Sequence, residues 1–363
     1  MKNYIFTPTV AKFADDLRTS MEVLNPAKAL GYEPCLMLVI QKGLQGVTED
    51  AEKQCKNLED KAKEFKDNPV ITMLSNMPIH EIDFLNNTYF AVDHVKKGID
   101  FAEKLPIGGR RIVTFHLNTL VSRQEFEGTS QEIWDEKLST KILPALEIVA
   151  KYSKDKGIEA KIEPVGVPEF GDIPDSDERN YQGVRLNQLR NPFYISSSSM
   201  FERIYNAGLG ICLDLCHNRT IYKAVVTGDI EKVLLPRDRE NLLGRTLLDD
   251  VRQLQKTDIV HLNDGAGIYS DEKKTVYLEG VPLGKGDISD LPYIVGYLNI
   301  VQIPFVLEVD EQGDFKNRPG TKHSLEYLGM LASPITTVKN LFETHNNPTT
   351  GFYRTPPLFL LDD

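Results

Sequence analysis

Short apolar runs alternate with longer amphipathic segments along most of the chain, and these two patterns predict strands and helices respectively. Several of the short runs are almost continuously apolar, as expected for strands of a parallel sheet that is buried on both faces. We predict eight strands, at 4–7, 35–40, 70–74, 111–116, 158–163, 209–214, 258–262 and 304–308.

The amphipathic segments between these strands carry apolar residues at helical spacing. We predict helices at 50–66, 86–105, 130–156, 199–206, 244–256, 288–298 and 321–331. Repeated strand–helix alternation is typical of a closed parallel barrel. An open doubly wound sheet is the alternative, but it would need a nucleotide-binding loop, and no GxGxxG or Walker-type segment opens a helix. We therefore predict the α/β class and a single (β/α)8 TIM barrel.

The length of the chain fits one such barrel with long loops. A barrel of this type takes about 250 residues, and the chain has 363. We expect the barrel to cover residues 1–333, and residues 334–363 to form a C-terminal extension that packs on the barrel or on a partner subunit. The segments 164–198 and 217–240 are too long for simple connections, and we expect both to be loops on the catalytic face.

Composition and charge narrow the class of protein. With 41% hydrophobic and 26% charged residues, the chain reads as soluble and globular. It has no apolar stretch long enough for a membrane span and no secretory signal pattern, and its four cysteines are too few for a disulfide framework, so we expect a cytoplasmic protein. The net charge of −11 argues against a general nucleic-acid binder.

Consecutive predicted strands end in residues that can bind metals. Carboxylates and imidazoles at the carboxyl ends of barrel strands meet on one face, where barrel enzymes have their active sites. A single such residue is more often structural, but a ring of them would repel or take up protons unless a cation lay among them. We therefore predict one or two divalent ions per chain: Mn, Zn, Co, Mg or Fe. The residues at these strand ends are His80, His116, Glu163, Asp214 with His217, His261 and Glu308.

Four motifs carry a resemblance to a known family: ICLDLCH at 211–217, VHLND at 260–264, PLGKGDI at 282–288 and VLEVD at 306–310. With them the chain, up to about Met330, resembles the xylose-isomerase-like barrel superfamily. This superfamily holds sugar isomerases and epimerases, inosose dehydratase relatives and apurinic endonucleases of the endonuclease IV type (AP endonuclease family 2). The resemblance implies a shared metal site with the ligands Glu163, Asp214, His261 and Glu308.

The resemblance also implies catalytic roles. In epimerase-like members the two glutamates act as an acid/base pair, so Glu163 and Glu308 would move a proton at a substrate carbon while the metal polarises the sugar. His217 resembles a histidine that contacts substrate hydroxyls. We expect a metal-dependent isomerase or epimerase that acts on a sugar, polyol or related small molecule, so that its substrate is carbohydrate-like. A homo-oligomer is a further expectation.

A dinuclear metallohydrolase is the alternative, either a phosphodiesterase or a diverged endonuclease IV-like enzyme. In such enzymes histidines that match His80 and His116 complete a second metal site, bridged by the counterpart of Glu163. However, residues 278–280 read Leu-Glu-Gly where the endonucleases have Asp-x-His, and residues 81–83 are acidic, which removes expected phosphate contacts. An arginine that many epimerases carry after the seventh strand is also missing. A non-catalytic binding barrel is a third hypothesis.

Overall fold

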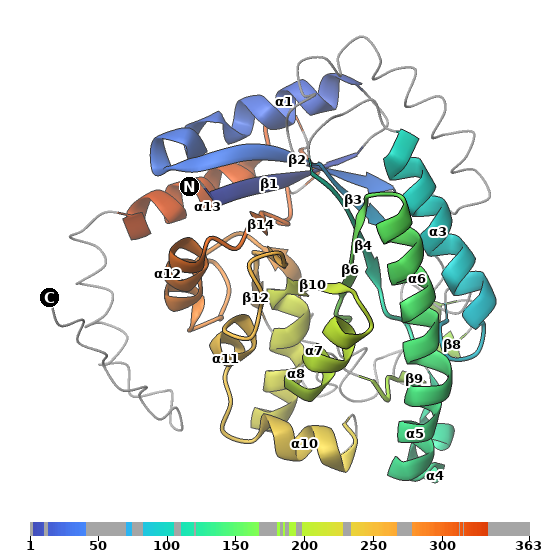
Figure 1. Cartoon of the computed structure of the whole chain (residues 1–363). Helices are drawn as coiled ribbons and strands as arrows, with labels where there is room; N and C mark the ends of the chain where they lie inside the picture. Colours follow the sequence, from blue (N-terminus) through green and yellow to red (C-terminus); the bar gives the residue numbers. More distant parts are fainter. Residues whose placement is uncertain are drawn as a thin grey trace, which may run out of the picture.

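The computed structural model describes residues 3–10, 14–40, 70–74, 83–104, 110–119, 121–166, 180–181, 184–185, 189–193, 198–227, 234–266, 278–311, 313–314 and 316–332 (Figure 1). Within them eight parallel strands close into a barrel in the order of the chain, which confirms the predicted fold class. Each predicted strand is present, and two of them have the predicted bounds. The barrel strands are β1 (Asn3–Val10), β2 (Tyr32–Ile40), β3 (Val70–Leu74), β4 (Arg111–His116), β6 (Glu159–Glu163), β10 (Gly210–Asp214), β11 (Ile259–His261) and β14 (Phe305–Val306).

Helices surround the barrel, and α3 and α6 lie side by side on one flank of it (Figure 1). None of the helices in the described part of the chain has both the length and the apolar character needed to cross a membrane. The principal helices are α1 (Ala14–Leu24), α3 (Thr88–Lys104), α5 (Gln131–Lys137), α6 (Leu143–Asp155), α7 (Ser198–Asn206), α8 (Leu215–Thr227), α10 (Pro236–Leu242), α11 (Leu247–Val251), α12 (Leu291–Val301) and α13 (Pro319–Ala332).

Most predicted helices are present, with different bounds. The helix predicted at 130–156 is interrupted by a π-helical turn, Leu138–Ile142, and the one predicted at 244–256 is reduced to the five residues of α11. Helix α1 was not predicted. The helix predicted at 50–66 and the C-terminal extension at 334–363 lie outside the described residues, so both stay predictions.

The predicted loop at 217–240 is wrong. Helix α8 begins at Leu215, directly after strand β10 ends at Asp214, and α10 begins at Pro236, so most of the described residues of this segment are helical. The loop predicted at 164–198 is described only in part. Within it, β7 (Asn180–Tyr181) pairs with β8 (Val184–Arg185). Its strand β9 (Leu189–Arg190) pairs with β5 (Val121–Ser122), which lies earlier in the chain.

Alternation along the strands decides which side chains reach the barrel interior. Side chains two residues apart on a strand share a face, so the interior residues Cys212 and Ile259 lie on the same face of their strands as Asp214 and His261. Apolar side chains line much of this interior, and two buried polar residues, Lys161 and Thr114, lie on the same face of β6 and β4 as Glu163 and His116. The buried interior cluster consists of Cys35, Met37, Ile112, Cys212, Ile259 and Val306, with Tyr4 packed against it.

One buried carboxylate joins two of the motifs found in the sequence. Asp264 lies in β12 (Asp264–Ala266), which pairs with β13 (Leu278–Val281). Its Oδ1 accepts hydrogen bonds from the backbone N–H groups of Gly265 and Ile288, and its Oδ2 from those of Gly284 and Gly286. The aspartate of VHLND therefore holds the turn formed by PLGKGDI and has no oxygen directed at the strand-end ring.

Candidate metal centre

Four strand-end residues converge at the carboxyl-terminal mouth of the barrel. Glu163, Asp214 and His261 end strands β6, β10 and β11, and Glu308 lies two residues past β14. Each offers one donor atom, and these atoms all lie within 4.8 Å of one another. The parallel register places Asp214 opposite His261, so the ring follows directly from barrel closure. These are the four residues that the family resemblance implies as metal ligands.

The spacing of the donor atoms fits a small cation. His261 Nδ1 lies 3.2 Å from Glu163 Oε1, 3.5 Å from Asp214 Oδ2 and 2.5 Å from Glu308 Oε2. Ligand atoms bound at about 2.1 Å to one ion lie about 3.0–3.4 Å apart in octahedral or tetrahedral geometry. The four side chains can therefore surround one divalent ion with small adjustments.

Several of these atoms are buried without a hydrogen-bond partner in the described structure. They include both carboxylate oxygens of Glu163, Nδ1 of His261 and Oε2 of Glu308. Glu163 and His261 are both fully buried (0% exposed). Buried polar groups are nearly always paired, and an unpaired buried charge is costly. The donor set thus has the chemistry and the unmet bonding capacity that a divalent ion would satisfy.

The carboxylates and imidazoles of the group shift one another's pKa values. Burial alone would raise the pKa of Glu163, but His261 and His116 outweigh it and hold that pKa well below its usual value. Burial is likewise outweighed at Asp214, where His217 and His261 lower the pKa to about 2. At His261 burial opposes the charged form, yet Cys212, Glu308 and Glu163 raise its pKa well above the usual value. A proton on His261 therefore balances the carboxylates in the metal-free protein, and a divalent ion would replace it.

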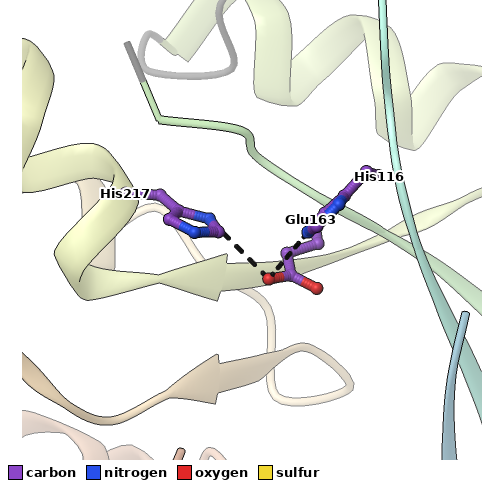
Figure 2. A group of neighbouring side chains, drawn as sticks. All are labelled: His116, Glu163 and His217. Carbon is purple, nitrogen blue, oxygen red and sulfur yellow. Dashed lines mark ion pairs between the residues drawn. The ribbon is translucent and has the colours of Figure 1, made fainter. Parts of the chain in front are cut away.

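A second group shares Glu163. Figure 2 shows the rings of His116 and His217 on either side of its carboxylate. His116 Nε2 lies 3.2 Å and His217 Nδ1 3.7 Å from Glu163 Oε1, and these three residues also satisfy the spacing of a metal-binding group. The predicted second site paired His116 with His80, but His80 lies outside the described residues. The sequence did not predict that His217 would join His116 at Glu163.

A backbone carbonyl fixes the tautomer of His217. Its Nδ1 lies 2.9 Å from the carbonyl oxygen of Pro164. A carbonyl oxygen only accepts hydrogen bonds, so Nδ1 carries a hydrogen, and in the neutral ring Nε2 holds the lone pair. His217 is therefore prepared to bind a metal, or to accept a hydrogen bond from a substrate hydroxyl, through Nε2.

Asn263 is a polar residue of the centre that the sequence analysis missed. Its Nδ2 donates to Asp214 Oδ2 over 3.1 Å, and its Oδ1 accepts the backbone N–H of Cys216 over 2.9 Å. Its place two residues after His261 in VHLND was the available signal, because side chains that follow a barrel strand surround the site.

Comparisons with known proteins bear on the fold. No family model and no curated protein matches the chain. A crystal structure of a D-tagatose 3-epimerase-like protein superposes with a TM-score of 0.52 and 17% identity, covering 93% of this chain and 99% of that one. A D-allulose 3-epimerase from Methylomonas sp. superposes with a TM-score of 0.49 and 12% identity, covering 91% of this chain and 99% of that one. A xylose isomerase-like TIM barrel protein from Mycobacterium smegmatis in complex with magnesium superposes with a TM-score of 0.47 and 12% identity, covering 89% of each chain. The chain thus shares the fold of the D-tagatose 3-epimerase-like protein, in agreement with its closed barrel of eight parallel strands.

Proposed function

We propose that this protein is a divalent-metal-dependent isomerase or epimerase of a sugar, a polyol or a related small molecule. The observation that carries the proposal is the convergence of Glu163, Asp214, His261 and Glu308. Donor atoms of Glu163, His261 and Glu308 are buried there without a hydrogen-bond partner in the described structure. The similar structure described as D-tagatose 3-epimerase-like accords with it through the shared fold. The net charge of −11 favours a carbohydrate-like substrate over nucleic acid.

The proposed ligands would hold one ion at the mouth of the barrel. When bound, such an ion polarises a carbonyl and a neighbouring hydroxyl of the substrate, which makes the adjacent C–H more acidic. Glu163 and Glu308 come from strands that are separated by β10 and β11 in the barrel, so they approach a bound substrate from different sides. One carboxylate takes the proton from the carbon, and the other, in its protonated form, returns a proton to the product.

His217 would orient the substrate. Because the Pro164 carbonyl holds the hydrogen on Nδ1, Nε2 can accept a hydrogen bond from a substrate hydroxyl. The side chain is 15% exposed, so a small molecule can reach it. Its first-turn position on α8 fixes it beside Asp214, whose Oδ1 accepts the His217 backbone N–H over 2.9 Å.

Deuterium incorporation tests the proposal. Candidate ketoses are incubated in D2O with the protein loaded with Mn²⁺, Co²⁺ or Mg²⁺, and deuterium should appear at the carbon beside the carbonyl. Glu163→Gln should lower the exchange rate by about 10²–10⁴-fold, the usual contribution of an acid/base group. Glu159→Gln is the matched control, because Glu159 lies on the same strand at its other end, paired with Arg110 and Lys161.

The control should keep its exchange activity even where it unfolds more easily. Equal rates for Glu163→Gln and the wild type would remove Glu163 from the reaction. A wild-type protein that binds no divalent ion and exchanges no deuterium in any ketose would refute the proposed function.

One observation favours a dinuclear hydrolase as a second candidate: the group of His116, Glu163 and His217 can hold a further ion beside the first. Two ions sharing a carboxylate suit hydrolysis of a phosphodiester, since both can hold the phosphate oxygens. The test is cleavage of DNA with an abasic site, and of a small phosphodiester, by the zinc-loaded protein. Cleavage that is lost in His116→Ala would establish the hydrolase, and no cleavage with one ion bound per chain would dismiss it.

A further inference from the structure

The amide of Asn263 lies between a proposed metal ligand and the helix that follows it. Asn263 is 1% exposed, and its two polar atoms contact Asp214 Oδ2 and the backbone N–H of Cys216. A backbone N–H can only donate, so the amide oxygen must face Cys216 and the NH2 group must face Asp214. The chemistry of the two partners therefore fixes the orientation of the amide.

Asp214 is held from two sides. Its Oδ2 accepts the Asn263 amide, and its Oδ1 accepts the backbone N–H of His217 over 2.9 Å. Helix α8 begins at Leu215, so Asp214 is the N-cap residue and His217 is in the first turn. Asn263 satisfies one free N–H of that turn, and Asp214 satisfies another.

The oxygen that Asn263 contacts is the one directed at the other proposed ligands. Asp214 Oδ2 lies 3.5 Å from His261 Nδ1, whereas Oδ1 is engaged with the helix. A carboxylate oxygen has two lone pairs, so Oδ2 can accept from Asn263 and still bind a cation. Without the amide, the carboxylate would lose one of the two hydrogen bonds that it accepts from Asn263 and the His217 backbone.

We propose that Asn263 is a positioning residue of the metal centre, which directs Asp214 Oδ2 at the ion and fixes it to the helix turn that carries His217. This role rests on the proposed metal-dependent function. Groups that hydrogen-bond to metal ligands typically change metal affinity by about 10–100-fold when they are replaced.

The substitution Asn263→Asp separates the two contacts. Aspartate has nearly the same shape and keeps an acceptor for the Cys216 N–H, but it sets a second carboxylate against Asp214 where the amide donated. Asn218→Asp is the matched control. Asn218 is also buried and donates to Asp250 Oδ2 over 3.3 Å, so the same change opposes two buried carboxylates away from the four proposed ligands.

The measurements are Co²⁺ affinity, by competition with a chelating dye, and the visible absorption of bound Co²⁺, on full-length proteins whose fold is checked by circular dichroism. Asn263→Asp should bind Co²⁺ about 10–100-fold more weakly than the wild type with an altered spectrum, while Asn218→Asp should stay within about threefold with an unchanged spectrum. Asn263→Ala removes the donor without adding charge, and it replaces Asn263→Asp in the test if the aspartate variant does not fold. We expect Asn263→Ala to bind Co²⁺ about tenfold more weakly than the wild type.

An affinity within about threefold of the wild type in a folded Asn263 variant would overturn the positioning role, as would an equal loss in Asn218→Asp. A wild-type protein that binds no Co²⁺ would overturn the proposed function itself, and this role with it. The two failures are distinguishable, because only the second appears before any substitution is made.

Discussion

Replacing Gly286 with alanine should destabilise the barrel strongly, because the new methyl group has no room. A Cβ at this position would lie 2.3 Å from Asp264 Oδ1 and 2.3 Å from the backbone oxygen of Gly265. Neither atom can move freely. The carboxylate accepts hydrogen bonds from the backbone N–H groups that hold the turn, and the Gly265 oxygen accepts the N–H of Asp287 over 2.8 Å.

The size of the effect follows from the bonds that must break. A hydrogen bond to a charged group contributes about 1.5–3 kcal/mol, and relief of the overlap displaces Asp264 from at least two of its donors. We expect the free energy of unfolding to fall by about 3–5 kcal/mol, within the range of the larger single-residue effects. At about 2.1 cal/mol/K of unfolding entropy per residue, a chain of 363 residues should lose roughly 4–7 °C of melting temperature.

Thermal unfolding followed by circular dichroism measures this loss, and Gly296→Ala is the control. Gly296 lies inside helix α12, and a Cβ there would meet nothing within 4 Å. The control should gain about 0.8–1 kcal/mol from the higher helix propensity of alanine. A Gly286→Ala protein that melts within about 1 °C of the wild type would show that the Asp264 contacts do not hold the turn at 282–288.

Two further predictions concern the metal centre. Mn²⁺ or Co²⁺, added at about 100 times its dissociation constant, should raise the free energy of unfolding by about 2.7 kcal/mol, and a chelator should reverse this gain. A melting temperature that no divalent ion changes would contradict the metal site. Because the pKa of His261 is raised well above its usual value, the metal-free site carries a proton that the ion must displace. Metal affinity should therefore rise with pH, by about tenfold per pH unit as long as binding releases one proton. Calorimetry in buffers of different ionisation enthalpy counts the protons released. Binding without proton release would contradict a protonated His261 in the metal-free site.

The strands were predictable because their apolar runs end sharply at a charged or polar residue. β3 and β4 have the predicted bounds, and β6, β10 and β11 end at or within one residue of the predicted position. Helix α1 was missed although Leu17, Met21 and Leu24 follow helical spacing in its sequence, ADDLRTSMEVL. The π-helical turn at Leu138–Ile142 keeps the helical pattern of apolar residues nearly intact, so the sequence alone reads it as one continuous helix.

The candidate ligands were predictable for the same reason, since each one ends a strand or follows it closely. The contacts between segments distant in the chain were not. His116 faces Glu163 because β4 pairs with β6, and the register of that pairing is a property of the closed barrel. Asn263 reaches Asp214 across 49 positions of sequence, and an asparagine after a strand gives no sign of which carboxylate it will contact.

The incorrect loop at 217–240 changes where substrate specificity should be sought. Asp214 was interpreted as a strand-end ligand, but Asp is also a favoured N-cap, and the structure shows it closing β10 and capping α8 at once. His217 is thereby fixed by helix geometry one turn from Asp214, so the residues of α8 cannot adapt to a substrate as a loop would. The segment 164–198 begins against His217, whose Nδ1 bonds the Pro164 carbonyl and whose Cα would lie 3.5 Å from a Cβ at Gly166. Changes at residues 164–166 should therefore alter substrate choice through His217, because the Pro164 carbonyl accepts a hydrogen bond from the ring that we propose to contact the substrate.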